Sequence, residues 1–349
     1  MSRLGFRLGI VLVAIAIGLM SLGLVFSSWT AAAADPDANV RALQRAVQVH
    51  GQHSPRLLSL KGVAGTAMGV SARGEWAVKV YTIQAGVGGI PERLDGVPVE
   101  AEVTGAFFAL KPPGGGGGTK IDPTGVFPRP VPIGVSTGNE NEVSAGTIGC
   151  RVKDSANNVY ALSNNHVYAR QNNAKPGEKI LQPGLYDLAY DENNVIGNLY
   201  TFVPIVWGGT TENTVDAAIA LCTVDTLGNS TPLTGYGTPQ STTAGAFVGQ
   251  KVQKYGRTTS LTKGYVSGIK ATVKVTYSSG TALFTNQIVV TASKGKFIGA
   301  GDSGSLLVTD PGKAPVGLLF AGTSNGRTAI ANQIGDVLIA FGVTVDGSQ

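Results

Sequence analysis

The run KVQKYGRTTSLTKGYVSGIKATVKVTYSSGTALFTNQIVVTA, residues 251–292, decides the fold class. Valine, isoleucine, threonine and tyrosine recur there at β-strand spacing, and turn residues interrupt the pattern roughly every ten positions. Short β-rich runs of the same kind extend from about residue 131 to the end of the chain. This pattern predicts a mostly β domain over 131–349, as one large sandwich or barrel or as two closely packed barrels.

The composition excludes several other classes of protein. The 349 residues include 49 Gly and 17 Pro and are only 14% charged, which argues against helical bundles and coiled coils. A hydrophobic content of 43% is enough for a buried core. The formal charge is +5, and it falls to +3 without Arg3 and Arg7, which is too dilute for a nucleic-acid-binding surface.

The first 34 residues have the pattern of an export signal. Residues 8–26 are apolar apart from Ser21, follow Arg3 and Arg7, and precede the small residues at 31–34. This order is typical of a cleaved signal peptide over 1–34 and predicts a secreted or periplasmic protein. The alternative is an uncleaved anchor, because 19 apolar residues nearly span a bilayer. Membrane association is expected only in that case.

Residues 35–110 predict a small α+β module, and residues 111–130 a linker with five glycines at 114–118. The module is expected to act as a pro-domain or as a regulatory domain. Its expected elements are a helix from Asp37 that Gly51 stops, a hairpin of 63–70 and 74–83, a short helix around 90–94 and a strand at 97–103.

Three residues of the β domain form a candidate catalytic set. His166, in YALSNNHVYA, is its only histidine, and Asp216, in NTVDAAIAL, opens an apolar strand. Ser303 stands in GAGDSGSLLV, where Gly301 and Gly304 allow a tight bend that aims the N–H groups of Gly301 and Ser303 at one point. Ser303 would be the nucleophile, His166 its base and Asp216 the group that orients the imidazole.

The order His166, Asp216, Ser303, with NNHV, VDAAIA and GDSGS, resembles the chymotrypsin-like serine peptidases. GTIGCRVKD, ILQPGLYD and KYGRTTSLTKGYV are similar to a bacterial branch related to the plant narrow-leaf proteases, and RTTSLTKG resembles streptogrisin-type enzymes. The resemblance covers roughly residues 131–343. It implies a double six-stranded antiparallel β-barrel and an endopeptidase that forms an acyl-enzyme on protein or peptide substrates, without metal or cofactor.

The resemblance also implies where substrate binds. Phe297 stands where trypsin-like members carry a carboxylate, and 292–301 contain no Asp or Glu, which favours a small or apolar P1 residue. Phe320, Ala321 and Gly322 resemble the strand that pairs with the substrate backbone. Asp302 is expected to be satisfied internally, by an arginine that the sequence does not identify.

Other assignments stay open in the sequence. Cys150 and Cys222 could form one disulfide or be two small buried residues. Asp187 and Asp225 are rivals of Asp216, and the turn at 186–194 is interpreted as solvated rather than as a calcium loop. His50 and His53 are not expected to bind metal, because Gly51 lies between them and a third ligand is missing nearby.

Two functions compete with the endopeptidase. A non-catalytic peptide-binding scaffold on the same fold would be favoured by loss of a triad residue, but all three are present. A serine esterase would use the same acyl-transfer chemistry. The extended strand near Phe320 favours peptides over small esters, because a small ester has no peptide backbone that could pair with the strand.

Overall fold

The computed structural model describes residues 36–109 and 122–349. The expected signal peptide and the five glycines at 114–118 lie outside these residues. Within the described ranges, no helix combines the length and apolar character needed to cross a bilayer.

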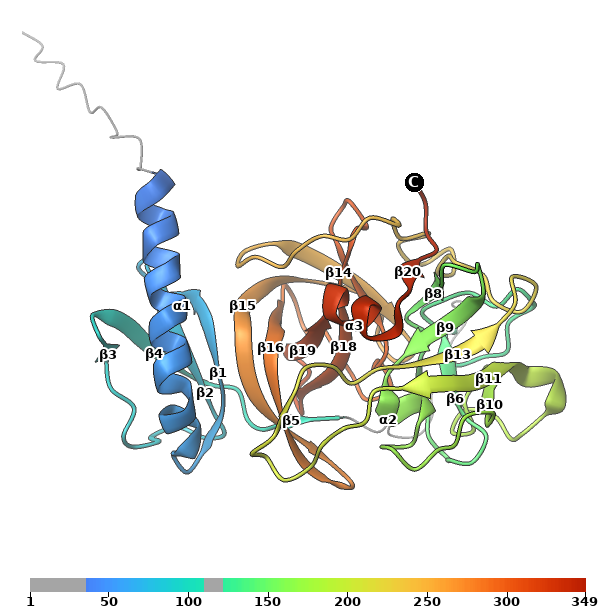
Figure 1. The fold of residues 1–349 in the computed structure, drawn as a ribbon, viewed down its shortest axis with the longest axis horizontal. Helices are drawn as coiled ribbons and strands as arrows, with labels where there is room; N and C mark the ends of the chain where they lie inside the picture. Colours follow the sequence, from blue (N-terminus) through green and yellow to red (C-terminus); the bar gives the residue numbers. More distant parts are fainter. Residues whose placement is uncertain (1–35, 110–121) are drawn as a thin grey trace, which may run out of the picture.

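The amino-terminal module begins with helix α1 (Pro36–Ser59), which packs against a small sheet (Figure 1). The predicted end at Gly51 is wrong, because the helix continues through Gly51 and Pro55. A single glycine costs a helix only about 1 kcal/mol. The last turns bury Leu57 completely and Leu58 almost completely, and this burial offsets that cost.

The strands of the module are β1 (Val63–Val70), β2 (Trp76–Thr82), β3 (Arg93–Leu94), β4 (Val97–Val103) and β5 (Phe107–Phe108). The predicted hairpin and the predicted strand at 97–103 are confirmed. The predicted helix around 90–94 is wrong, since Leu94 pairs with Val97 in a hairpin. Asp95 and Gly96 form its two-residue turn with positive φ angles, the conformation that Asp-Gly favours between strands.

Six strands close into a barrel in the carboxy-terminal half: β14 (Lys251–Gly256), β15 (Ser260–Tyr277), β16 (Gly280–Ala292), β17 (Leu306–Thr309), β18 (Pro315–Thr323) and β19 (Thr328–Gln333). The hydrogen-bonded order is β16-β19-β18-β17-β14-β15, and the pairing of β15 with β16 closes the ring. Strand β12 (Glu212–Asn213) joins β16, and helix α3 (Ile334–Phe341) follows β19.

The other curled sheet has the order β20-β8-β9-β13-β11-β10-β6-β7. Helix α2 (Asn165–Tyr168) follows β9, and the 3₁₀ helix η1 (Glu192–Asn194) precedes β11. The strands are β6 (Ser136–Asn139), β7 (Gly146–Thr147), β8 (Cys150–Lys153), β9 (Val159–Ser163), β10 (Lys179–Leu181), β11 (Val195–Phe202), β13 (Ala218–Cys222) and β20 (Thr344–Val345). This sheet is the first barrel, and the closed ring of β14 to β19 is the second barrel. The inward side chains of the first barrel share one core that also includes Leu306 and Leu318 from the second barrel.

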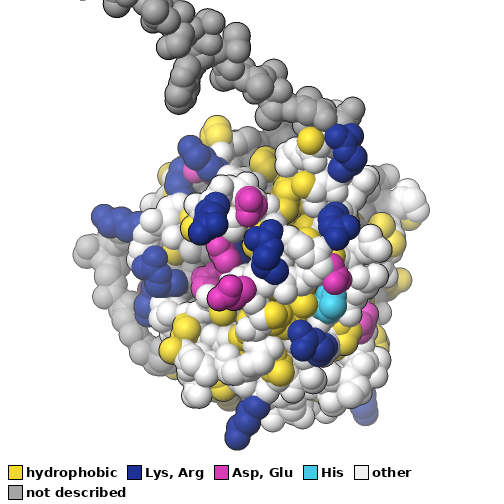
Figure 2. Space-filling model, turned by 90° about the vertical axis from the view of Figure 1, so that its left-hand side faces the viewer, with side chains coloured by type: hydrophobic (Ala, Val, Ile, Leu, Met, Phe, Trp, Pro, Cys, Tyr) yellow, Lys and Arg dark blue, Asp and Glu magenta, His cyan; other side chains and the backbone are white. Residues whose placement is uncertain are grey.

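The module shares a sheet with the second barrel. Strand β1 pairs antiparallel with β15, from Gly65 opposite Val273 to Met68 opposite Ile269. Figure 1 shows the module beside β15, with β5 reaching across to the barrel. The outer face of the module carries interspersed positive and negative side chains (Figure 2). Within the module, Lys79 and Glu100 form an ion pair.

His50 makes the stability of the module depend on pH. Its side chain is buried between α1 and β1, where Nε2 lies 3.0 Å from Thr66 Oγ1, and this burial lowers the pKa of His50 to about 4. The unfolded chain binds a proton below about pH 6.5, but the folded chain does so only near pH 4. Stability is therefore full above pH 6.5 and declines as the pH falls toward 4.

We expect the titration of His50 to lower the free energy of unfolding by about 2 kcal/mol when the pH falls from 7 to 5. Replacing His50 with glutamine should remove that part of the pH dependence, as measured by urea unfolding at the two pH values. His53→Gln is the matched control, because His53 lies in a more exposed pair with Asp95. An equal pH dependence in His50→Gln and wild type would show that His50 is not the group responsible.

Candidate active site

The structure brings His166 and Asp216 into direct contact. His166 lies in the single turn of α2 immediately after β9, and Asp216 lies just before β13, the strand that pairs with β9. Nδ1 of His166 is 2.6 Å from Oδ2 of Asp216, and the backbone N–H of His166 donates to Oδ1 at 3.2 Å. Two bonds from one residue fix the tautomer and the orientation of the imidazole.

Asp216 has further partners that the sequence did not indicate. Its carboxylate is wholly buried and also accepts a hydrogen bond from the hydroxyl of Tyr277 at 2.8 Å. Its backbone N–H donates to Oδ1 of Asn332, and its carbonyl accepts from Nδ2 of Asn164. Tyr277 and Asn332 belong to the second barrel, so both barrels hold this carboxylate.

Ser303 lies in a tight turn before β17, as predicted. Gly301 and Gly304 have φ angles of 97° and 92°, and a Cβ on Gly301 would lie 2.7 Å from Oγ1 of Thr258. Within the described residues, the N–H groups of Gly301 and Ser303 donate to no protein acceptor. Thr147 of the first barrel binds the carbonyls of both residues, so the turn is fixed while its two amides stay available to an oxyanion.

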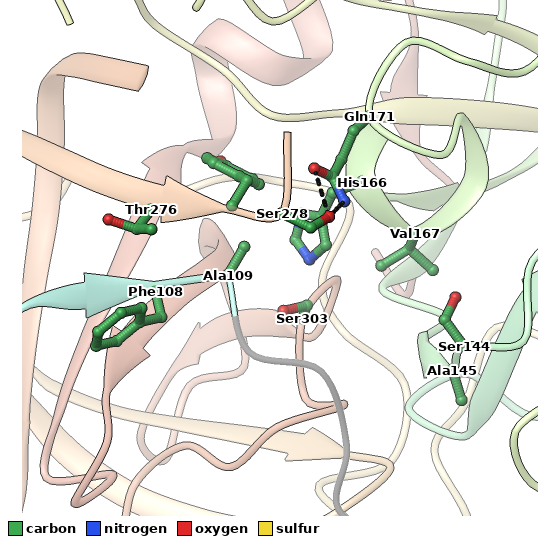
Figure 3. A pocket seen from close by; sticks show the side chains of 11 residues that line it. Phe108, Ala109, Ser144, Ala145, His166, Val167, Gln171, Thr276, Ser278 and Ser303 are labelled. Carbon is green, nitrogen blue, oxygen red and sulfur yellow. Dashed lines mark hydrogen bonds between the residues drawn. The ribbon is translucent and has the colours of Figure 1, made fainter. Parts of the chain in front are cut away.

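His166 and Ser303 line the same cavity of about 330 Å³ (Figure 3). Nε2 of His166 is buried and has no hydrogen-bond partner within the described ranges. The Ser303 hydroxyl instead donates to the carbonyl of Phe320 at 3.5 Å. A catalytic hydrogen bond is often long or unformed before substrate binds, and rotation about one side-chain bond redirects this hydroxyl.

Asp302 is satisfied internally, as predicted, but its partner is Lys254 and not an arginine. Lys254 Nζ lies 3.2 Å from Oδ2 of Asp302, and both side chains are wholly buried. The carboxylate also accepts bonds from the backbone N–H groups of Thr258, Thr259 and Gly299. Burial lowers the pKa of Lys254, and the charge of Asp302 opposes that effect.

Asp187 is not part of a solvated turn. Its buried carboxylate pairs with Arg257, whose Nε lies 2.9 Å from Oδ2. The solvated-turn interpretation is therefore wrong for Asp187, although Asp191 is exposed and caps η1. Asp225 is exposed and lies in no contact with His166, which leaves Asp216 as the carboxylate beside the imidazole.

The possible disulfide between Cys150 and Cys222 is not formed, and both thiols are free and buried. Strands β8 and β13 lie on opposite sides of β9, with Cys150 opposite Leu162 and Cys222 opposite Val159. The two cysteines are therefore two strand spacings apart, about 10 Å, whereas a disulfide requires Cα atoms within roughly 7 Å of each other. Burial raises the pKa of each thiol to about 12.

The residues expected to bind substrate fall into two groups. Phe297 is wholly buried in the core of the second barrel, so the structure does not bring it to the cavity. Phe320 and Ala321 are also buried side chains of β18, which includes Gly322, and the carbonyl of Phe320 contacts the Ser303 hydroxyl. Ile298 packs closely against Gly322, since a Cβ added to Gly322 would lie 2.5 Å from Cγ2 of Ile298.

Strand β5 of the module occupies the edge of β18. Phe108 pairs antiparallel with Gly322 and Phe107 with Thr323, while the same two residues pair parallel with β15. Phe107 is wholly buried, and Phe108 and Ala109 line the cavity that contains His166 and Ser303 (Figure 3). No pattern in the sequence indicated this contact, because β5 and β18 are more than 200 residues apart.

The closed carboxy-terminal barrel and the other curled sheet, with the cavity of His166 and Ser303 between them, form a double β-barrel that resembles the fold of the chymotrypsin-like serine peptidases. Residues 222–346 match the family model described as the Nal1 C-terminal domain. The chain is 41% identical over 108 residues to streptogrisin-A from Streptomyces griseus, a match covering 30% of this chain and 33% of that protein. The match thus spans about a third of that relative's length, and it confirms the predicted resemblance.

Two solved structures are similar in fold. A glutamic acid specific serine protease is 24% identical, with 62% of this chain and 100% of that chain covered at a TM-score of 0.44. Protease A of Thermobifida fusca is 19% identical, with 62% and 99% covered at a TM-score of 0.46.

Proposed function

We propose that this chain is an exported serine endopeptidase in which His166, Asp216 and Ser303 form the catalytic triad. The observation that carries the proposal is the buried contact between His166 Nδ1 and Asp216 Oδ2, with Nε2 left free toward the cavity of Ser303. The apolar run at 8–26 supports export to an extracytoplasmic compartment.

The proposed reaction needs only protein groups. Nε2 of His166 takes the proton of Ser303 while Oγ bonds to the scissile carbonyl carbon, and the N–H groups of Gly301 and Ser303 bind the resulting oxyanion. The C–N bond then breaks as the imidazolium gives its proton to the leaving amine. Water then takes the place of the amine. Its oxygen bonds to the acyl carbon while Nε2 of His166 takes its proton, and that proton passes to Oγ as the ester bond breaks, which restores the Ser303 hydroxyl.

A small or apolar P1 residue remains our proposal for specificity. Residues 292–301 contain no Asp or Glu, so this segment provides no carboxylate to pair with a cationic P1 side chain. Peptides that differ only in P1 should therefore be cleaved faster with alanine than with arginine.

The test of the main proposal is covalent labelling with a fluorophosphonate, with the modified residue located by peptide mapping. Modification of Ser303, together with hydrolysis of a peptide amide, would establish an endopeptidase. Modification with cleavage of esters but not amides would favour the esterase. If Ser303 stays unmodified, the peptide-binding scaffold becomes the better interpretation.

We further propose that the module regulates this site by occupying it with β5. The pairing of Phe108 with Gly322 places a strand of the chain itself where a peptide substrate would pair with β18. Ala109 extends this strand into the catalytic cavity. A bound peptide would have to displace β5 and replace its backbone hydrogen bonds.

Phe108→Pro should admit peptides more easily, because proline removes the N–H of Phe108 and weakens β5. We expect labelling by a peptidyl chloromethyl ketone to speed up several-fold relative to labelling by a small fluorophosphonate. Phe108→Ala keeps the N–H and serves as the control, and the thermal midpoints of all three proteins verify folding. An unchanged ratio of the two labelling rates in Phe108→Pro would exclude β5 as an occupant of the substrate site.

A further inference from the structure

The carboxylate of Asp216 has one partner that lies outside the proposed triad. The Tyr277 hydroxyl donates to Oδ2 at 2.8 Å, the same oxygen that contacts Nδ1 of His166. Burial, with the nearby charge of Asp216, raises the pKa of Tyr277 well above its usual range. Tyr277 is thus a neutral donor at every pH at which the protein would work.

The tyrosine ring is held from several sides. It lies edge-on to His166 with centroids 5.7 Å apart, and it contacts Trp207 and Phe284 at 5.3 and 6.2 Å. Tyr277 is the last residue of β15, and Gln171 bonds to Ser278 and Ser279 in the turn that follows. Gln171 lies just after α2, the helix that carries His166. The segment that follows this helix therefore also fixes the turn beside Tyr277 (Figure 3).

We infer that Tyr277 is a positioning residue for the catalytic histidine, acting through Asp216. A buried carboxylate that bonds only to an imidazole could rotate or accept bonds from water. The Tyr277 hydroxyl fills the remaining acceptor direction of Oδ2 and locks the carboxylate against His166. Because Tyr277 belongs to the second barrel, it also ties the histidine of one barrel to the barrel that carries Ser303.

The hydroxyl has an electrostatic effect as well. Its positive end points at Asp216 and disperses part of the carboxylate's negative charge, which weakens the attraction between that charge and a protonated His166. Asp216 and Tyr277 are the titratable groups in contact with His166 among the described residues, and the other side chains that line the cavity are uncharged. Removing the hydroxyl should therefore favour protonation of His166.

The test is Tyr277→Phe, which keeps the ring and its packing. The inference rests on the proposed role of His166 as base, so one readout is independent of activity: NMR titration of the histidine ring protons, with His166 assigned from a His166→Gln variant. We expect the midpoint of the His166 titration to rise by roughly half to one pH unit. The acid limb of the pH–rate profile should move the same way, with kcat roughly tenfold lower and KM little changed.

Tyr255→Phe is the matched control, because it also removes a buried hydroxyl, but one that contacts the neutral Thr234. A shift in Tyr277→Phe alone supports the inference. Equal midpoints in wild type and Tyr277→Phe, in a folded protein, overturn it. If the shift appears but wild type hydrolyses no peptide, the proposed function fails while the positioning contact stands.

Discussion

We expect replacement of Ser303 with alanine to abolish fluorophosphonate labelling and to lower peptide hydrolysis by a factor on the order of 10⁴ to 10⁶. The loss is this large because Ser303 supplies the only bond to the acyl group in the proposed reaction. The two N–H groups of the turn and the binding cleft remain, and these account for the residual rate. Initial rates with a peptide amide measure the effect.

Ser305→Ala is the matched control for this change. Ser305 lies two residues further on, is wholly buried and donates to the carbonyl of Asp302. Its loss should weaken the turn slightly without abolishing labelling. Labelling that survives in Ser303→Ala would assign the nucleophile to another residue. His166→Gln should match the loss in Ser303→Ala, because members of a triad act as one unit.

We expect replacement of Lys254 with methionine to lower the free energy of unfolding by about 3 to 5 kcal/mol. Methionine has a similar length but no charge, so the buried Asp302 loses its counter-ion at the base of the turn that carries Ser303. Gly256 allows this close approach, since a Cβ there would lie 2.6 Å from Oδ1 of Asp302. Urea unfolding at pH 7 measures the change.

The double variant Lys254→Met with Asp302→Asn separates the charge from the packing. It removes both charges, so we expect it to be more stable than Lys254→Met alone. Lys263→Met, which breaks the more exposed pair with Asp310, is the control and should cost at most about 1 kcal/mol. A Lys254→Met protein as stable as this control would mean that the backbone N–H groups and the Thr259 hydroxyl satisfy Asp302 without the lysine.

Local patterns predicted some elements well. The hairpin of the module and the strand at 97–103 follow from alternation and turn residues that act within a few positions. The helix α1 shows where local signals fail. Gly51 favours an end there, but Leu57 and Leu58 bury enough apolar surface to carry the helix past it.

Charged residues were harder to assign, because their partners are set by the fold. The sequence indicated that Asp302 is satisfied internally and suggested an arginine, but it did not identify the partner. In the structure Lys254 points inward to Asp302, while Arg257 reaches Asp187 in the other barrel. The two cysteines show the same limit, since only the order of strands separates β8 from β13.

The sequence by itself determined the β-rich fold class and the candidate set of His166, Asp216 and Ser303, because strand alternation, glycine turns and the short motifs around these three residues are local properties of the chain. Only the tertiary structure decided that Tyr277 and Asn332 hold Asp216 and that β5 lies along β18. These contacts join residues that are 61 to more than 200 positions apart. Their pairing depends on how the barrels close on each other, and a pattern within one strand carries no information about that.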